Sequence, residues 1–150
     1  MMSDDIIAYS RARHPGPHRE RVGLVALFYG LFAAPIVWAG DLMIDYGLAT
    51  HGCYPGNLPL HFPSAGFGGI WWAMLLCHVV ALVLIASGGL VSYRNWRVTG
   101  PPRGHSHHLI ERGEGRTRFF GIVGMGFSAM FLLTVAAETL ALAWLPLCGY

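Results

Sequence analysis

The chain has 150 residues, of which 54% are hydrophobic and only 12% are charged. A soluble globular domain of this composition would lack the polar surface that it needs, which excludes that class of protein. The formal net charge of +2 is too small to indicate a nucleic-acid-binding protein, so we expect no nucleic-acid partner.

Residues 1–21 precede any apolar segment and predict a polar tail outside the folded part of the chain. Three long apolar stretches follow, at about residues 22–50, 67–93 and 119–147. Each exceeds the roughly 20 residues that a helix needs to cross the hydrocarbon core of a bilayer. We therefore predict an all-α integral membrane protein, in which residues 22–150 form a single domain of three transmembrane helices.

The first apolar stretch has two notable features. Pro35 lies inside it and predicts a kink, because proline removes a backbone donor and clashes with the preceding turn. Val37-Trp38-Ala39 resembles the small-x-small pattern of a signal-peptide cleavage site, so cleavage is an alternative. The apolar character continues past Gly40, and an anchored helix is the preferred interpretation.

All ten basic residues are arginines, four in the tail and six between the second and third stretches. The positive-inside rule then predicts a cytoplasmic N-terminus and an arginine-rich cytoplasmic loop, with the first loop and the C-terminus outside. The arginines are also suitable partners for anionic lipid headgroups.

The predicted spans contain four ionisable residues: Asp41, Asp45, His78 and Glu138. Counting along the helices at about 1.5 Å per residue places Asp41 and Glu138 at similar depth, with His78 nearby. We expect Asp45 to be hydrated one turn further out, and Thr134 to hydrogen-bond Glu138 from the preceding turn.

Ionisable groups in a bilayer are costly unless they are paired, protonated or hydrated, so this intramembrane cluster is a candidate site. Three interpretations are open: helix packing by hydrogen bonds, which is preferred; proton or quinone handling; and ligation of haem or a metal ion.

Two cysteines, Cys53 and Cys148, follow the first and third spans, and the predicted topology places both outside. A disulfide between them is favoured there, with two unpaired cysteines as the alternative. The arginine-rich loop contains three histidines that are weak metal-ligand candidates, although a solvated loop is preferred. Alternating charges before the third span predict an interfacial turn that contacts headgroups or a partner. The residues concerned are His105, His107 and His108, then Glu111, Glu114, Arg116 and Arg118.

The chain has no lysine and therefore no phosphate-binding loop ending in Lys-Ser/Thr. It also has no nucleophile elbow, no Cys-x-x-Cys-His haem attachment site and no zincin motif. We therefore expect no enzymatic activity and no resident cofactor, although haem, copper or quinone binding remains an alternative.

Several short motifs lie around the predicted spans: His51-Gly52-Cys53-Tyr54-Pro55, Gly69-Ile70-Trp71-Trp72, Trp96, His108-Leu109-Ile110-Glu111 and the segment Gly113-Glu114-Gly115-Arg116-Thr117-Arg118-Phe119. Together they resemble a group of small, uncharacterised proteobacterial three-span membrane proteins that accompany cytochrome c oxidase or related respiratory components.

The resemblance implies a multi-pass protein of the bacterial inner membrane with a periplasmic C-terminus. It implies a non-catalytic accessory or assembly component of a haem-copper oxidase, within the lipid bilayer and attached to a larger complex. The alternative is a redox or proton-handling protein that binds haem, copper or quinone through Asp41, His78 and Glu138. A bilayer protein without a respiratory link is a third class.

Overall fold

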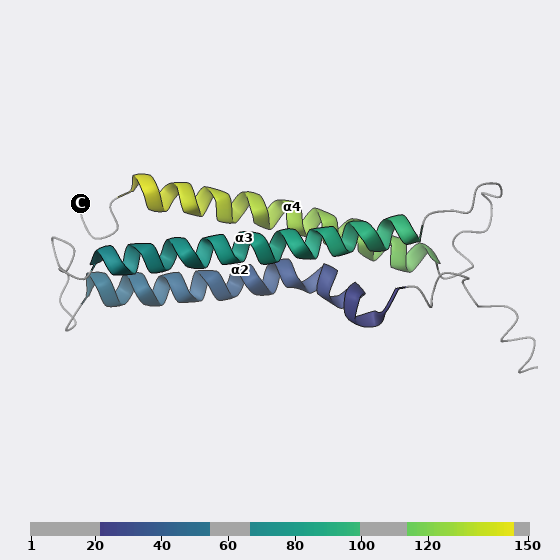
Figure 1. Cartoon of the computed structure of the whole chain (residues 1–150), viewed down its shortest axis with the longest axis horizontal. Helices are drawn as coiled ribbons and strands as arrows, with labels where there is room; N and C mark the ends of the chain where they lie inside the picture. The colour runs from purple at the N-terminus through teal and green to yellow at the C-terminus, as the bar shows by residue number, and fades with distance from the viewer. Residues whose placement is uncertain (1–21, 55–66, 100–113, 146–150) are drawn as a thin grey trace, which may run out of the picture.

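A computed structural model describes residues 22–54, 67–99 and 114–145, and these contain three helices and no strand (Figure 1). The helices are α2 (Leu24–Cys53), α3 (Phe67–Val98) and α4 (Glu114–Trp144). Their 30 to 32 residues rise about 45 Å, more than the roughly 30 Å of a hydrocarbon core. All three are long and apolar enough to span a membrane, which confirms the predicted all-α class with three candidate spans.

Two helices extend beyond the predicted spans on the side of the arginine-rich loop. α3 continues through Val98 instead of ending at residue 93, and α4 begins at Glu114 instead of 119. The charged segment from Glu114 is thus the first turn of a helix and not an interfacial turn. Apolar patterning marks where a helix leaves hydrocarbon, whereas arginine and glutamate sustain helical backbone beyond it. Thr99 closes α3, since both its amide and its hydroxyl donate to the Asn95 carbonyl, at 3.1 and 2.8 Å.

Pro35 lies inside α2, as predicted, and α2 changes direction toward its N-terminal end (Figure 1). Proline has no amide hydrogen to donate to the carbonyl of Leu31, one turn earlier. The missing hydrogen bond and the ring clash account for a bend at this point in the helix.

The three helices approach one another closely at Gly30, Ser92 and Gly124, here named the glycine contact. The Ser92 hydroxyl donates to the Gly30 carbonyl across 2.9 Å. A Cβ added at Gly124 would lie 2.7 Å from the same carbonyl oxygen and would collide with Ser92. Gly30 and Ala34, one turn apart on α2, are both buried. Small residues allow this close approach of backbones, as in other membrane helix pairs.

A single seam of α3 faces the other two helices. Its buried positions recur at alternating intervals of four and three residues, the spacing of left-handed helix packing. Ile85 on this seam is fully buried and packs with Ala34 and Val135 from the other two helices. The buried positions are Met74, His78, Ala81, Ile85, Gly88, Ser92, Asn95 and Thr99.

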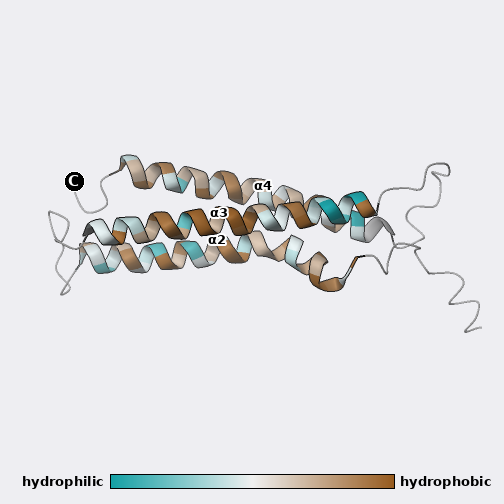
Figure 2. Cartoon of the chain, viewed as in Figure 1, coloured by the Kyte–Doolittle hydropathy of each residue, from teal (hydrophilic) through white to brown (hydrophobic). Residues whose placement is uncertain are grey.

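Hydrophobic residues recur along all three helices, as the brown bands of Figure 2 show. Large side chains such as Val83, Leu133 and Phe119 are exposed on different helices. Helices that are hydrophobic all round need an apolar surrounding, either lipid or another membrane protein.

Candidate functional site

Each helix contributes one ionisable side chain to a cluster inside the bundle, here named the polar centre: Asp41 from α2, His78 from α3 and Glu138 from α4. One ligand atom from each residue lies within 4.8 Å of the other two. Asp41 follows Gly30 by eleven residues, so the polar centre lies about 16 Å along α2 from the glycine contact. The structure therefore brings together the three residues that depth counting grouped.

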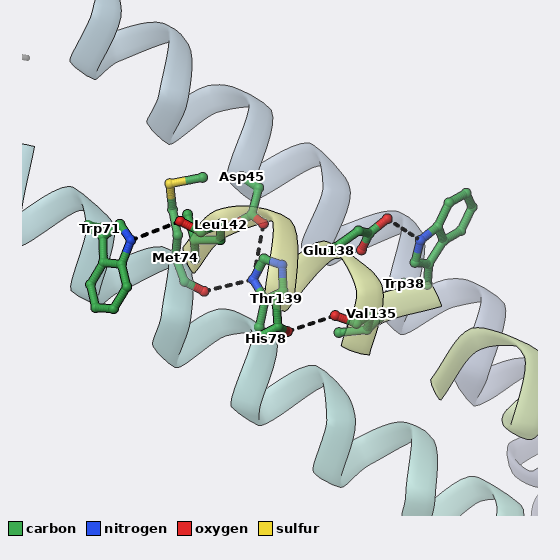
Figure 3. A network of polar contacts seen from close by, with 9 residues as sticks. All are labelled: Trp38, Asp45, Trp71, Met74, His78, Val135, Glu138, Thr139 and Leu142. Atoms are coloured by element: carbon green, nitrogen blue, oxygen red, sulfur yellow. Dashed lines mark hydrogen bonds and ion pairs between the residues drawn. The ribbon is translucent and has the colours of Figure 1, made fainter. Parts of the chain in front are cut away.

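The hydrogen bonds of His78 define its tautomer. Its Nδ1 lies 2.9 Å from the Met74 carbonyl oxygen and 3.2 Å from Oδ2 of Asp45 (Figure 3). A carbonyl oxygen only accepts, so Nδ1 carries a hydrogen and donates it. The second nitrogen, Nε2, lies on the side of Glu138 (Figure 3) and keeps its lone pair in the neutral ring.

Asp45 differs from its predicted role as a hydrated residue further out. Its side chain is only 16% exposed, and its carboxylate accepts the His78 Nδ1–H from one turn beyond Asp41. Counting residues along a helix gives the depth of each Cα in the membrane. A carboxylate can lie above or below its own Cα, so its depth differs from the counted one. Asp45 and the Met74 carbonyl thus both contact Nδ1 and orient the His78 ring.

Glu138 has a partner that the sequence did not reveal. The indole Nε1 of Trp38 donates to Oε1 of Glu138 across 3.2 Å (Figure 3). The Trp38 ring also packs on Phe131, with centroids 5.1 Å apart. A partly buried indole N–H needs an acceptor, and Glu138 is the acceptor it finds here. The need of this indole for an acceptor could have been recognised in the sequence, because Trp38 precedes Asp41 by only one helical turn.

The predicted hydrogen bond between Thr134 and Glu138 is not formed. Thr134 Oγ1 donates instead to the Met130 carbonyl of its own helix, at 3.1 Å. Thr139 does the same toward Val135, at 2.7 Å. Threonine hydroxyls in helices commonly bond the carbonyl four residues earlier, and this local acceptor is always in reach.

Asp41 is the unusual member of the polar centre. It is only 5% exposed, yet neither carboxylate oxygen has a hydrogen-bond partner among the described residues. A buried carboxylate without a partner is costly in an apolar surrounding. Within the described part of the chain, His78 is the one basic side chain at the polar centre. Arg94, the next on α3, is sixteen residues away, or about 24 Å along the helix.

Glu138 also reaches the outside of the bundle. A shallow, open groove lies along one face of α4 and is lined by residues of α4 alone, with Thr134 and Glu138 as its polar lining residues. Its other lining residues are Met130, Leu133, Ala137 and Ala141. Beyond the polar centre, Trp71 Nε1 donates to the Leu142 carbonyl across 3.2 Å, which ties α4 to α3 (Figure 3). The polar centre therefore has one member that borders both the bundle interior and an apolar groove.

The remaining predicted residues are placed only in part. Cys53 is buried at the end of α2, but Cys148 lies outside the described residues, so the disulfide stays a prediction. Arg118 lies over the Trp96 ring at 5.6 Å and so joins α4 to α3. Also outside the described part are His105, His107, His108, Glu111 and the side chains of Glu114 and Arg116.

The polar centre offers one imidazole nitrogen and two carboxylates, with Asp45 and Trp38 as hydrogen-bonded supports. Such a set can transfer a proton, hold a cation or fasten the helices. Comparisons with protein-family models, with curated proteins and with solved structures found no match. The geometry of the polar centre and of the α4 groove is therefore the structural basis for a functional proposal.

Proposed function

We propose that this protein is a non-catalytic accessory or assembly component of a larger respiratory membrane complex, a haem-copper oxidase of the bacterial inner membrane. The resemblance of its loop motifs supplies the respiratory link. The observation that best supports a partner is the groove on α4, which α2 and α3 leave uncovered.

The chemistry of the groove suits a transmembrane helix. Ala137 and Ala141 lie one turn apart in it and keep the backbone of α4 accessible, while Thr134 and Glu138 offer polar groups. Small residues with polar neighbours characterise helix–helix interfaces in membranes, where close packing and hydrogen bonds replace the hydrophobic effect. On this proposal a helix of the partner complex packs against α4.

The proposed orientation has a cytoplasmic N-terminus and a periplasmic C-terminus. The described arginines, Arg94, Arg97 and Arg118, support it, because all lie at the end of the bundle where α2 begins (Figure 1). Arg97 lies 5.7 Å from the ring centre of Tyr93, a pairing suited to a membrane interface. Cys53 lies at the opposite end, where an oxidising periplasm would permit its disulfide with Cys148.

The second candidate function is a redox or proton-handling role for Asp41, His78 and Glu138. The specific observation that favours it is the buried carboxylate of Asp41, which lacks a partner among the described residues. Helix packing by hydrogen bonds would use these oxygens, whereas a bound proton or cation would neutralise the carboxylate. Haem held by two histidines is disfavoured, because His51, the other described histidine, is exposed.

Purification of the tagged protein from its native membrane in a gentle detergent tests the accessory role. We expect oxidase subunits in near-stoichiometric amounts by mass spectrometry. Replacing both Ala137 and Ala141 with leucine should fill the groove, so that the oxidase subunits no longer co-purify. Ala129→Leu is the matched control, since Ala129 is an exposed alanine of α4 that does not line the groove. A wild-type protein that purifies alone would contradict the stable-subunit role.

A further inference from the structure

We propose that the polar centre binds one divalent first-row transition-metal ion of the class of Zn²⁺, through Asp41, His78 and Glu138. This site is independent of the accessory role: metal binding is measured on the isolated protein, whereas the accessory role concerns its partners.

The donor set and its spacing suit such an ion. One imidazole and two carboxylates are ordinary ligands for Zn²⁺, Fe²⁺ or Mn²⁺, whereas soft Cu⁺ prefers thiolate and thioether sulfur. The three donors lie within 4.8 Å of one another. Metal–ligand bonds of about 2.0–2.2 Å require a closer approach, by about 1 Å, which side-chain rotation can supply. Because each donor comes from a different helix, an ion here would join all three.

The tautomer of His78 prepares it for this role. Met74 and Asp45 both accept from Nδ1, so the lone pair of Nε2 is left for an ion. Metal-binding histidines almost always donate their other ring hydrogen to a carboxylate or a backbone carbonyl, and His78 donates to one of each. Figure 3 shows Nε2 on the side of Glu138.

The carboxylates of Glu138 and Asp41 also have oxygens that are left for an ion. Trp38 donates to Oε1 of Glu138, which orients this carboxylate and leaves Oε2 for an ion. Hydrogen-bonded supports of this kind hold metal-ligating carboxylates in other proteins. Asp41 is 5% exposed, and both of its oxygens lack partners among the described residues. A cation bound beside it would satisfy this carboxylate.

The charge of the polar centre also favours a cation. Asp41, Asp45 and Glu138 place three carboxylates around one histidine, and the described arginines lie at another level of the bundle. Even a protonated His78 would leave an excess of negative charge when the carboxylates are ionised. A divalent ion reduces that excess where water is scarce and electrostatic attraction is strong. Three protein ligands would leave a fourth tetrahedral position for water or another small ligand.

Metal content and affinity test the proposal on the full-length protein in detergent. The protein is stripped with a chelator, dialysed and reloaded with Zn²⁺, and the bound metal is measured by elemental mass spectrometry and titration calorimetry. We expect about one ion per chain. Loading with Co²⁺ should give visible absorption bands of nitrogen and oxygen coordination.

Four variants locate the site. Asp41→Asn and His78→Gln should each weaken Zn²⁺ binding by at least about 100-fold, because each removes a direct ligand. Asp45→Asn should weaken it by about 10–100-fold while the stoichiometry stays the same, as expected of a residue that orients a ligand. His51→Gln is the matched control, since His51 is the exposed histidine of α2. The affinity of this variant for Zn²⁺ should equal that of the wild type.

Two results would overturn the proposal. One is a wild-type protein that binds no stoichiometric Zn²⁺ and gives no Co²⁺ absorption bands. This result is obtained without any variant. The other is unchanged affinity in Asp41→Asn and His78→Gln proteins that keep their helicity and elute as single species. If either variant does not fold, Glu138→Gln replaces it, because Glu138 is partly exposed and its amide remains a hydrogen-bond acceptor for Trp38.

Discussion

The glycine contact and the polar centre are built from the same three helices by opposite means. At the glycine contact, Gly30, Ser92 and Gly124 leave no room for another atom, and the buried hydroxyl has its acceptor. At the polar centre, long side chains occupy the space, and the Asp41 carboxylate has no partner among the described residues. Figure 1 shows α4 diverging from its neighbours toward the end beyond the polar centre. The comparison shows that the same bundle is closely packed with satisfied polar groups in one region and keeps buried polar atoms without described partners in the other.

The largest expected effect follows from overpacking the glycine contact. Gly124→Leu places a side chain against the Gly30 carbonyl and Ser92, and should lower the free energy of unfolding by about 3 kcal/mol. Unfolding in mixed micelles, followed by circular dichroism, measures it. Gly126→Leu is the matched control, because a Cβ at Gly126 meets nothing within 4 Å. Equal effects in the two variants would show that the close approach at Gly124 contributes little.

At the polar centre we expect smaller changes in the free energy of unfolding, with opposite signs for substitutions of Asp41 and Asp45. In metal-free protein, Asp41→Asn should raise the free energy of unfolding by about 1 kcal/mol, because a buried carboxylate without a partner is removed. Asp45→Asn should lower it by a similar amount, about 1 kcal/mol, since Asp45 accepts from His78. The same micelle titration, with chelator present, measures both. Destabilisation by Asp41→Asn would mean that this carboxylate already has a stabilising partner.

The smallest expected effect concerns the support of Glu138. Trp38→Phe keeps a ring against Phe131 but removes the hydrogen bond to Glu138, so it should cost about 0.6 kcal/mol. It should also weaken Zn²⁺ binding, which titration calorimetry on the same preparation detects. Trp72→Phe is the control, because Trp72 is 66% exposed and contacts none of Asp41, His78 and Glu138 in a described hydrogen bond. A loss of stability without a change in Zn²⁺ affinity would remove Trp38 from the metal site.

Several features of the fold could be predicted because they depend on the chain alone. A run of about 20 apolar residues without charges requires a membrane-spanning or fully buried helix, so all three helices were predictable. The constant rise of a helix made the shared depth of Asp41, His78 and Glu138 predictable as well. The ends of α3 and α4 were not, because arginine and glutamate continue a helix into water as readily as they end a span.

The partners within the site depended on tertiary structure. The sequence by itself determined which residues lie at one depth, since hydropathy and helical rise are properties of a single segment. Only the packing of three helices decided that His78 donates to Asp45, that Trp38 and not Thr134 bonds Glu138, and that Asp41 is left without a described partner. These outcomes depend on how far each helix is rotated about its axis and on which rotamers the neighbours allow. Both depend on how side chains far apart in the sequence pack against one another, which no single segment determines.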